Sequence, residues 1–96
     1  MANKPLIIYN PTANKGNAGK ILPVVETMLR EAGVEYDLVL TEGPEHAQKL
    51  AKQAVDEGCP LVVAAGGDGT VNEVINGLMQ TDLNHNGRPA LAVLPV

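Results

Sequence analysis

The residues best suited to chemistry in this sequence are the run Gly66-Gly67-Asp68-Gly69-Thr70, which directly follows a short apolar segment. Three glycines in four positions permit positive φ angles and leave backbone N–H groups uncovered, so the chain can approach an anion closely. A helix predicted to follow would point the positive end of its dipole at the same spot. The run therefore predicts a phosphate-binding turn, with an ordinary strand-to-helix turn as the alternative.

Asp68 is the acidic residue within this run. A carboxylate facing a phosphate repels it unless a cation lies between them, or unless the carboxylate accepts a hydrogen bond from a ligand hydroxyl. Asp68 is therefore a candidate for contact with a cation or a ligand hydroxyl, with a turn-forming residue as the alternative, and the sequence defines no metal ligand set. Thr70 and Glu73 also fit a structural role, because Thr-x-x-Glu ahead of an apolar stripe is a capping box.

Two other loops carry polar residues of the same kind. Residues 10–16 follow the apolar segment Leu6–Ile8, and residues 41–43 follow another apolar segment. In an open parallel sheet the carboxyl ends of the strands share one edge, and ligands bind there. We therefore expect these loops to lie beside the glycine run. Lys15 and Lys20 are weaker candidates for a phosphate contact at this edge.

Two common nucleotide motifs are missing. Gly-x-Gly-x-x-Gly fails because Asn72 stands where its last glycine should be, and a P-loop fails because Asn14 and Ile21 occupy its required positions. His46 and His85 stand alone, so we interpret both as surface residues.

The apolar pattern alternates strands and helices. Strands that alternate with helices of this length need crossover connections, which makes the sheet parallel. The fold class is therefore α/β, a three-layer α/β/α arrangement with a parallel sheet of four strands and three helices. The predicted strands are residues 5–9, 35–40, 61–65 and 90–96.

Prolines and glycines suggest where the helices begin and end. We expect the first helix to start near Gly19, so that Pro23 lies in its first turn, and to stop at Gly33. Pro44 is expected at the first position of the second helix, which stops at Gly58. The third helix is expected to follow the glycine run, and a loop over residues 80–89 would then lead to the last strand.

Composition excludes several function classes. A net charge of −4 with scattered basic residues, and only 2% aromatic residues, argue against nucleic acid binding. The apolar runs are too short for a signal peptide or a transmembrane segment. Cys59 is the only cysteine, so no internal disulfide forms, and we interpret it as a small packed residue of a cytoplasmic protein.

Three segments follow the first three predicted strands in order: Asn10-Pro11, Thr41-Glu42-Gly43-Pro44 and Gly66-Gly67-Asp68-Gly69-Thr70-Val71-Asn72-Glu73. Together they resemble the N-terminal nucleotide-binding domain of diacylglycerol-kinase-like lipid kinases, a group that includes bacterial lipid kinases and sphingosine kinases. The resemblance covers essentially the whole chain, and its glycine-rich block is shared only with NAD kinases and, more loosely, phosphofructokinases.

The resemblance implies that ATP and Mg²⁺ are the cofactors, and that the γ-phosphoryl group of ATP is transferred to the hydroxyl of a lipid such as diacylglycerol. It also implies a role for Asp68 near the metal or the phosphates. Asn14 departs from the pattern, because the family often has glycine there. The residues implied to touch the nucleotide are Asn10, Pro11, Thr12, Ala13, Asn14, Thr41, Gly66, Gly67, Asp68, Gly69, Thr70, Val71 and Asn72.

Family members continue beyond the point that corresponds to Val96 with a second, mostly β domain that carries the lipid site and the general base. The expectation is therefore a truncated N-terminal domain over residues 1–96, inactive alone, from an enzyme that can form a homodimer and sit peripherally at a membrane. The alternatives are the equivalent part of a NAD kinase and a stand-alone, non-catalytic nucleotide-binding module. We also expect the apolar last strand, around Leu91, Val93 and Leu94, to promote self-association.

Overall fold

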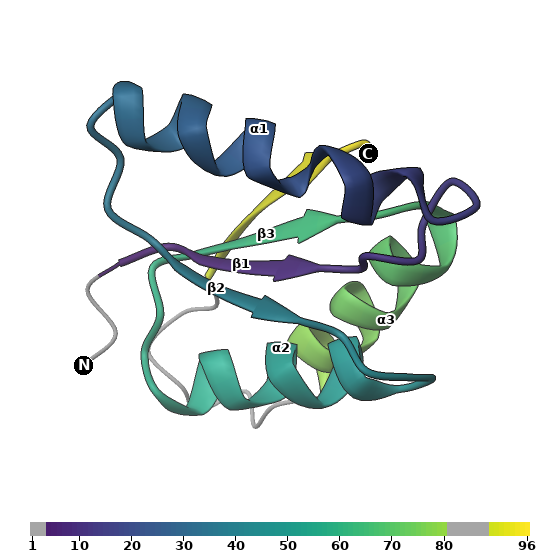
Figure 1. The fold of residues 1–96 in the computed structure, drawn as a ribbon. Coiled ribbons are helices and arrows are strands. Elements are labelled where there is room, and N and C mark those ends of the chain that lie inside the picture. The colour runs from purple at the N-terminus through teal and green to yellow at the C-terminus, as the bar shows by residue number, and fades with distance from the viewer. Residues whose placement is uncertain (1–3, 81–88) are drawn as a thin grey trace.

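The structure, a computed structural model, describes residues 4–80 and 89–96. They form three layers, with a sheet between α1 on one face and α2 and α3 on the other (Figure 1). This confirms the predicted α/β/α class, with strand ends that differ from prediction by one or two residues. The strands are β1 (Leu6–Tyr9), β2 (Asp37–Leu40), β3 (Leu61–Ala65) and β4 (Ala90–Leu94), and the helices are α1 (Asn17–Glu31), α2 (His46–Asp56) and α3 (Asp68–Met79).

All strand pairs are parallel, in the order β2-β1-β3-β4. From β1 the chain moves outward through α1 to β2, and from β2 it crosses back through α2 to β3 on the other side of β1. The connections that follow β1 and β3 therefore leave in opposite directions. In an open sheet this reversal opens a crevice at the carboxyl ends of those two strands, which is where ligands bind.

On the α2 and α3 side, the core is built from small residues. Ile8 and Val62 of the sheet are fully buried beneath Ala47 and Ala51 of α2. A Cβ atom added at Gly77 of α3 would lie 2.7 Å from the Ala51 Cβ atom, closer than real Cβ contacts allow. The absence of a side chain at Gly77 therefore lets the two helices pack closely.

On the α1 side, Tyr9 is fully buried at the end of β1. Its hydroxyl donates a hydrogen bond of 2.6 Å to the carbonyl oxygen of Ala18, in the first turn of α1. Burial also raises the pKa of the Tyr9 hydroxyl, since desolvation disfavours the phenolate. Tyr9 thus fixes the start of α1 to the sheet directly beside the loop that follows β1.

The helix starts differ from the sequence prediction. α1 begins at Asn17, so Pro23 lies in the helix interior and not in its first turn. Residues 11–16 form turns ahead of the helix, and the Ala18 N–H donates to the carbonyl of Ala13 at 3.2 Å. α2 begins at His46 and not at Pro44, because Glu45, the residue between them, has a φ of 66° and cannot extend a right-handed helix.

The predicted helix stops are confirmed. Gly33 and Gly58 follow the last residues of α1 and α2 with φ angles of 74° and 76°, a conformation that favours glycine. Most of the predicted loop over residues 80–89, including His85, lies outside the described residues.

Candidate functional site

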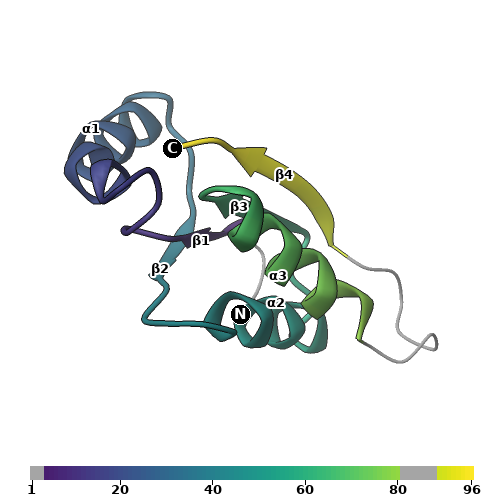
Figure 2. The same ribbon diagram turned by 90° about the vertical axis from the view of Figure 1, so that its right-hand side faces the viewer.

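The candidate site lies where the strands end at their carboxyl side, the edge that faces the viewer in Figure 2. Asn10 follows β1, and its backbone N–H donates to the carbonyl of Ala65 at the end of β3, at 2.8 Å. The N–H of Thr41, after β2, donates to the carbonyl of Tyr9 at 2.9 Å. These bonds extend the sheet pairing into the loops, so the loops start close together as the sequence predicted.

Asn10 connects two of these loops through its side chain. Its Oδ1 atom accepts hydrogen bonds from the backbone N–H of Thr12 at 3.0 Å and from the Thr12 hydroxyl at 2.8 Å. Its Nδ2 group donates to the hydroxyl oxygen of Thr70 in α3 at 3.1 Å. Asn10 therefore shapes the loop after β1 and fixes it to the start of α3.

The rest of the loop after β1 adopts an unusual backbone conformation. Asn14, Lys15 and Gly16 have φ angles of 53°, 58° and 87° in succession. Asn14 therefore adopts a left-handed conformation, which asparagine tolerates better than most residues. Left-handed geometry costs an ordinary residue about 1–2 kcal/mol, so other contacts must hold the loop in place. The N–H of Gly19 supplies one, donating to the Pro11 carbonyl at 2.8 Å.

A cavity of about 290 Å³ opens between the loop after β1, the loop after β2 and the first two turns of α3. Carbonyl, hydroxyl, amide and carboxylate groups face it, and Ala47 is one of its few apolar residues. The His46 Nδ1 atom accepts a hydrogen bond of 2.9 Å from the backbone N–H of Glu42, a lining residue, and this bond was not predicted from the sequence. The lining residues are Asn10, Thr12, Thr41, Glu42, Gly43, Pro44, Ala47, Thr70 and Glu73.

The glycines of the run Gly66–Gly69 act differently from the prediction. The described residues with positive φ angles do not include Gly66, Gly67 or Gly69, and Gly67 has a φ of −91°. A Cβ atom at Gly66 would lie 2.6 Å from the Thr70 hydroxyl oxygen, so Gly66 is needed for packing. At Gly67 and Gly69 an added Cβ would meet nothing within 4 Å. Both glycines therefore leave open space above the backbone, as an anion-binding turn requires.

The predicted capping box is wrong. The N-cap of α3 is Gly67, which has no side chain, and Thr70 is the third residue of the helix. Thr70 is only 6% exposed, and its hydroxyl accepts the hydrogen bond from Asn10. Glu73 lines the cavity. The start of α3 thus has no side-chain cap, and its first N–H groups face the site edge.

Asp68 is the first residue of α3 and is exposed. A carboxylate at this position is stabilised by the positive end of the helix dipole. Within residues 4–80 and 89–96, no group of three or more His, Cys, Asp or Glu side chains could hold a metal ion. A cation here would therefore need most of its ligands from a bound molecule or from residues outside those ranges.

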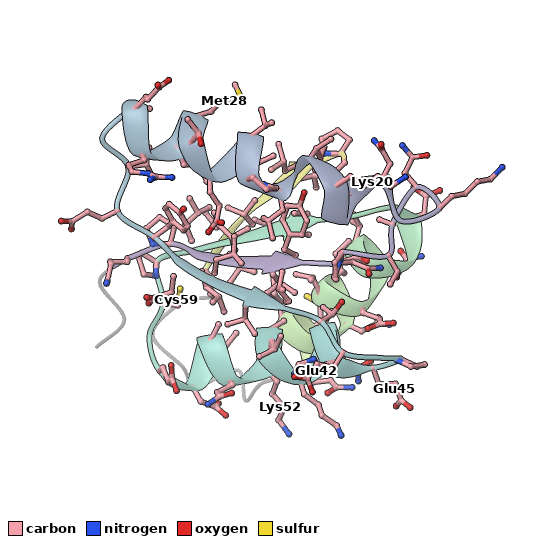
Figure 3. All side chains as sticks on the ribbon, viewed as in Figure 1. Lys20, Met28, Glu42, Glu45, Lys52 and Cys59 are labelled. Atoms are coloured by element: carbon pink, nitrogen blue, oxygen red, sulfur yellow. The ribbon has the colours of Figure 1, made fainter. Side chains whose placement is uncertain are left out.

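Other predicted residues do not line the cavity. Ala13 is buried in the core beneath α1, and Val71 packs against the core of α2 and α3. Asn72, Lys15 and Lys20 are exposed, and Figure 3 shows Lys20 on α1. For these residues, as for those that line the cavity, a contact with a nucleotide stays a prediction.

A larger cavity, of about 480 Å³, lies at the opposite edge of the sheet, beside Lys4, Asp37 and Cys59. Figure 3 shows Cys59 and Glu42 toward opposite ends of the strands. Cys59 is buried, as predicted for a small packed residue, and its thiol donates to the Leu61 carbonyl at 3.2 Å. None of the helices in the described residues begins at this edge, so the smaller cavity is the better candidate site.

Comparison with known proteins identifies the family of this chain. The chain matches the diacylglycerol kinase catalytic domain over residues 4–96. This chain belongs to the diacylglycerol kinase catalytic-domain family. It is similar to a solved structure of a diacylglycerol kinase from Bacillus anthracis, with a TM-score of 0.78 and 31% identity, over 97% of this chain and 31% of that one.

Curated relatives carry the same name. The chain is 36% identical to the diacylglycerol kinase of Staphylococcus carnosus and 38% identical to that of Staphylococcus saprophyticus, in each case over its full length. It spans about 30% of the length of these relatives. None of the helices in the described part of the chain is long and apolar enough to cross a membrane.

Proposed function

We propose that this chain is the ATP-binding part of a lipid kinase that transfers the γ-phosphoryl group of ATP to a lipid hydroxyl, such as that of diacylglycerol. The observation that carries the proposal is the uncapped start of α3, with open space above Gly67 and Gly69, at the point where the connections from β1 and β3 diverge. The match to the diacylglycerol kinase family favours a lipid kinase over a NAD kinase.

The charges around the site orient the nucleotide. The N–H groups at the start of α3 attract phosphate oxygens. Glu42 and Glu73 in the neighbouring cavity repel phosphates and can accept hydrogen bonds from sugar hydroxyls. The phosphates therefore lie over Gly67 and Gly69, and the nucleoside lies toward Thr41 and the loop after β2.

Mg²⁺ fits this arrangement only in part. It commonly binds one or two carboxylates together with phosphate oxygens and water. Asp68 can supply one carboxylate, and the phosphates supply further ligands. When bound, the ion neutralises charge on the phosphates as the phosphoryl group is transferred. The chain's own contribution is to hold the triphosphate in place.

The lipid site is proposed to lie outside this chain. The relatives are about three times as long, so the acceptor pocket and the general base have room in the additional residues. In the whole protein, the enzyme would work in the cytoplasm and reach its lipid at the membrane surface.

A titration with Mg·ATP, followed by the amide signals of the ¹⁵N-labelled chain, tests the nucleotide site. We expect the largest shifts in residues 10–14, in Thr41 and in residues 66–72, because these surround the proposed phosphates and nucleoside. ADP should bind at the same place, whereas adenosine should bind much more weakly, since it lacks the phosphates. Shifts centred on Lys4 and Asp37, or no binding at millimolar ATP, would contradict the proposal.

Asp68→Asn is the informative variant, and Asp37→Asn is its matched control at the opposite edge of the sheet. Asp37 is exposed and pairs with Lys4 at 3.6 Å. If Asp68 acts through the cation, its substitution should abolish the gain in ATP affinity that Mg²⁺ gives, while Asp37→Asn keeps it. Equal behaviour of the two variants would remove Asp68 from the metal site.

A further inference from the structure

The loop after β2, residues 41–45, forms one side of the candidate nucleotide cavity. Four of the nine residues that line the cavity belong to it, and they are Thr41, Glu42, Gly43 and Pro44. Thr41 is held by the sheet, since its backbone N–H donates to the Tyr9 carbonyl at 2.9 Å. Beyond Thr41 the loop leaves the sheet, and residues 42–45 are exposed. The shape of the cavity therefore depends on what fixes these residues.

His46, the first residue of α2, fixes this part of the loop. Its Nδ1 atom accepts a hydrogen bond of 2.9 Å from the Glu42 backbone N–H, and its own backbone N–H donates to the Gly43 carbonyl at 3.3 Å. Within residues 4–80 and 89–96, these are the hydrogen bonds that residues 42–44 make. Glu45 has a φ of 66°, which is unfavourable for a residue other than glycine. Contacts with His46 therefore hold the loop in a conformation that its own residues do not favour.

The hydrogen bond to Glu42 requires the neutral form of the His46 ring. A backbone N–H is always a donor, so the Nδ1 atom that faces it must carry a lone pair, and the ring proton sits on Nε2. A second proton would go to Nδ1 and would turn two donors toward each other at 2.9 Å. Protonation of His46 therefore breaks this hydrogen bond and frees the backbone of Glu42.

Charged groups of both signs surround His46. Figure 3 shows Glu42 and Glu45 near the start of α2, and α3, which packs beside α2, brings Glu73 to the same cavity. The carboxylates attract an imidazolium, whereas a lysine ammonium and the positive end of the α2 dipole repel it. Histidine ordinarily changes its charge between about pH 5 and 8. The charged residues of the loop, of the first turn of α2 and of α3 are Glu42, Glu45, Lys49, Asp68 and Glu73, and β1 contributes none.

We propose that His46 is a positioning residue of the nucleotide site, whose neutral ring holds the loop after β2 in the shape that binds the nucleoside. This role rests on the proposed function of the cavity. His46 is not among the lining residues, so it acts on a nucleotide through Glu42 and Gly43. When His46 is protonated the loop is released, and only the molecules with the loop in place bind nucleotide at full affinity. Nucleotide affinity therefore falls as the pH falls.

The hydrogen bond can be tested without nucleotide. Nuclear magnetic resonance of the ¹⁵N-labelled chain between about pH 5.5 and 8 follows the His46 ring nitrogens and the Glu42 amide. At pH 8 the ring should carry its proton on Nε2, and on acidification the Glu42 amide signal should move with the same midpoint as the ring. His85→Gln removes the other histidine of the chain and should leave both results unchanged. A Glu42 amide that does not follow the His46 ring, or a proton on Nδ1 at pH 8, would overturn the proposal.

Calorimetric titration with Mg·ATP tests the effect on binding, at pH 7.5 and at the lowest pH, near 5.5, at which circular dichroism shows the chains folded. His46→Ala offers no acceptor, so at pH 7.5 it should bind ATP about three- to tenfold more weakly than the original chain, as expected from one lost hydrogen bond. Between the two pH values, the affinity of the original chain should fall about three- to tenfold more than that of His46→Ala. This comparison removes the effect of protonating ATP itself, which is common to all variants.

His46→Asn is the conservative variant, because the asparagine Oδ1 atom lies where Nδ1 lies and accepts hydrogen bonds but does not titrate. It should bind ATP with nearly the original affinity at pH 7.5 and should show no larger fall than His46→Ala, whereas His85→Gln should behave like the original chain.

The outcomes separate the role of His46 from the proposed function of the cavity. Absence of ATP binding by the original chain at every pH would overturn both. An equal fall in the original chain and in His46→Ala, a fall in His46→Asn as large as the original one, or its loss in His85→Gln would overturn the role of His46 alone. In those three cases the nucleotide site would stand.

Discussion

Gly69→Ala separates a phosphate-binding turn from an ordinary start of a helix. Gly69 is the second residue of α3, and an added Cβ would contact nothing within 4 Å. Replacing glycine by alanine in a helix stabilises it by about 0.5–1 kcal/mol. In a domain of this size that raises the melting temperature by roughly 2–8 °C. If phosphates lie over Gly69, the methyl group occupies their space, and ATP affinity should fall at least about tenfold, or about 1.4 kcal/mol.

Gly77→Ala is the matched control, because it makes the same change in the same helix at a buried position. There the added methyl would lie 2.7 Å from the Ala51 Cβ atom. Overpacking of this kind costs about 1–3 kcal/mol. We expect Gly77→Ala to lower the melting temperature and to leave the ATP affinity of the folded chain unchanged, the reverse of Gly69→Ala.

Thermal unfolding and isothermal titration with Mg·ATP measure the two quantities for the original chain and both variants. A Gly69→Ala chain that is more stable and binds ATP with unchanged affinity would refute the placement of phosphates over the start of α3. A Gly69→Ala chain that loses stability would refute the reading of the space above Gly69 as open.

Asp68→Asn in the complete enzyme should lower activity at least about tenfold, roughly 1.4 kcal/mol, with a nearly unchanged melting temperature; lost stability with intact activity per folded molecule would make Asp68 a structural turn residue. Asn10→Ala should lower the free energy of unfolding by about 1–3 kcal/mol in chemical denaturation, because it leaves the buried Thr70 hydroxyl without its Asn10 donor. An unchanged free energy of unfolding would show that these hydrogen bonds do not hold the loop. Tyr9 has a raised pKa in the folded chain, so its hydroxyl loses the proton at a lower pH in the unfolded chain than in the folded chain. The free energy of unfolding, measured in urea, should therefore fall as the pH rises above about 10, and it should fall less steeply for Tyr9→Phe. The 96-residue chain should not phosphorylate diacylglycerol or sphingosine above a control without enzyme, since the acceptor site and base are proposed to lie elsewhere; measurable turnover would contradict this.

The order of elements was readable from the sequence because the relevant signals are local. An apolar run such as Leu61–Ala65, with glycines after it, forms a buried strand whichever neighbours it meets. Gly33 and Gly58 stop helices through their own backbone freedom. Helix starts were predicted less well, since they depend on loop conformation: Glu45 adopts a left-handed angle that nothing in its residue type requires.

The sequence could predict that the three polar segments meet at one sheet edge, because parallel strands bring their carboxyl ends together by topology. The internal connections of the candidate site could not be predicted. The hydrogen bond from Asn10 to Thr70 joins residues sixty positions apart, and it replaces the local capping box that the Thr-x-x-Glu spacing suggested. A buried hydroxyl takes the partner that the fold brings to it, and here that partner is Asn10.

The sequence by itself determined the α/β class, the glycine-rich turn and the family resemblance, since each depends on residue types at short spacing. Only the tertiary structure decided what each glycine does. Gly66 and Gly77 are needed because another element approaches them, whereas Gly67 and Gly69 leave space for something else. The physical reason is that the space around a Cβ position is set by elements distant in sequence, and no local pattern records it.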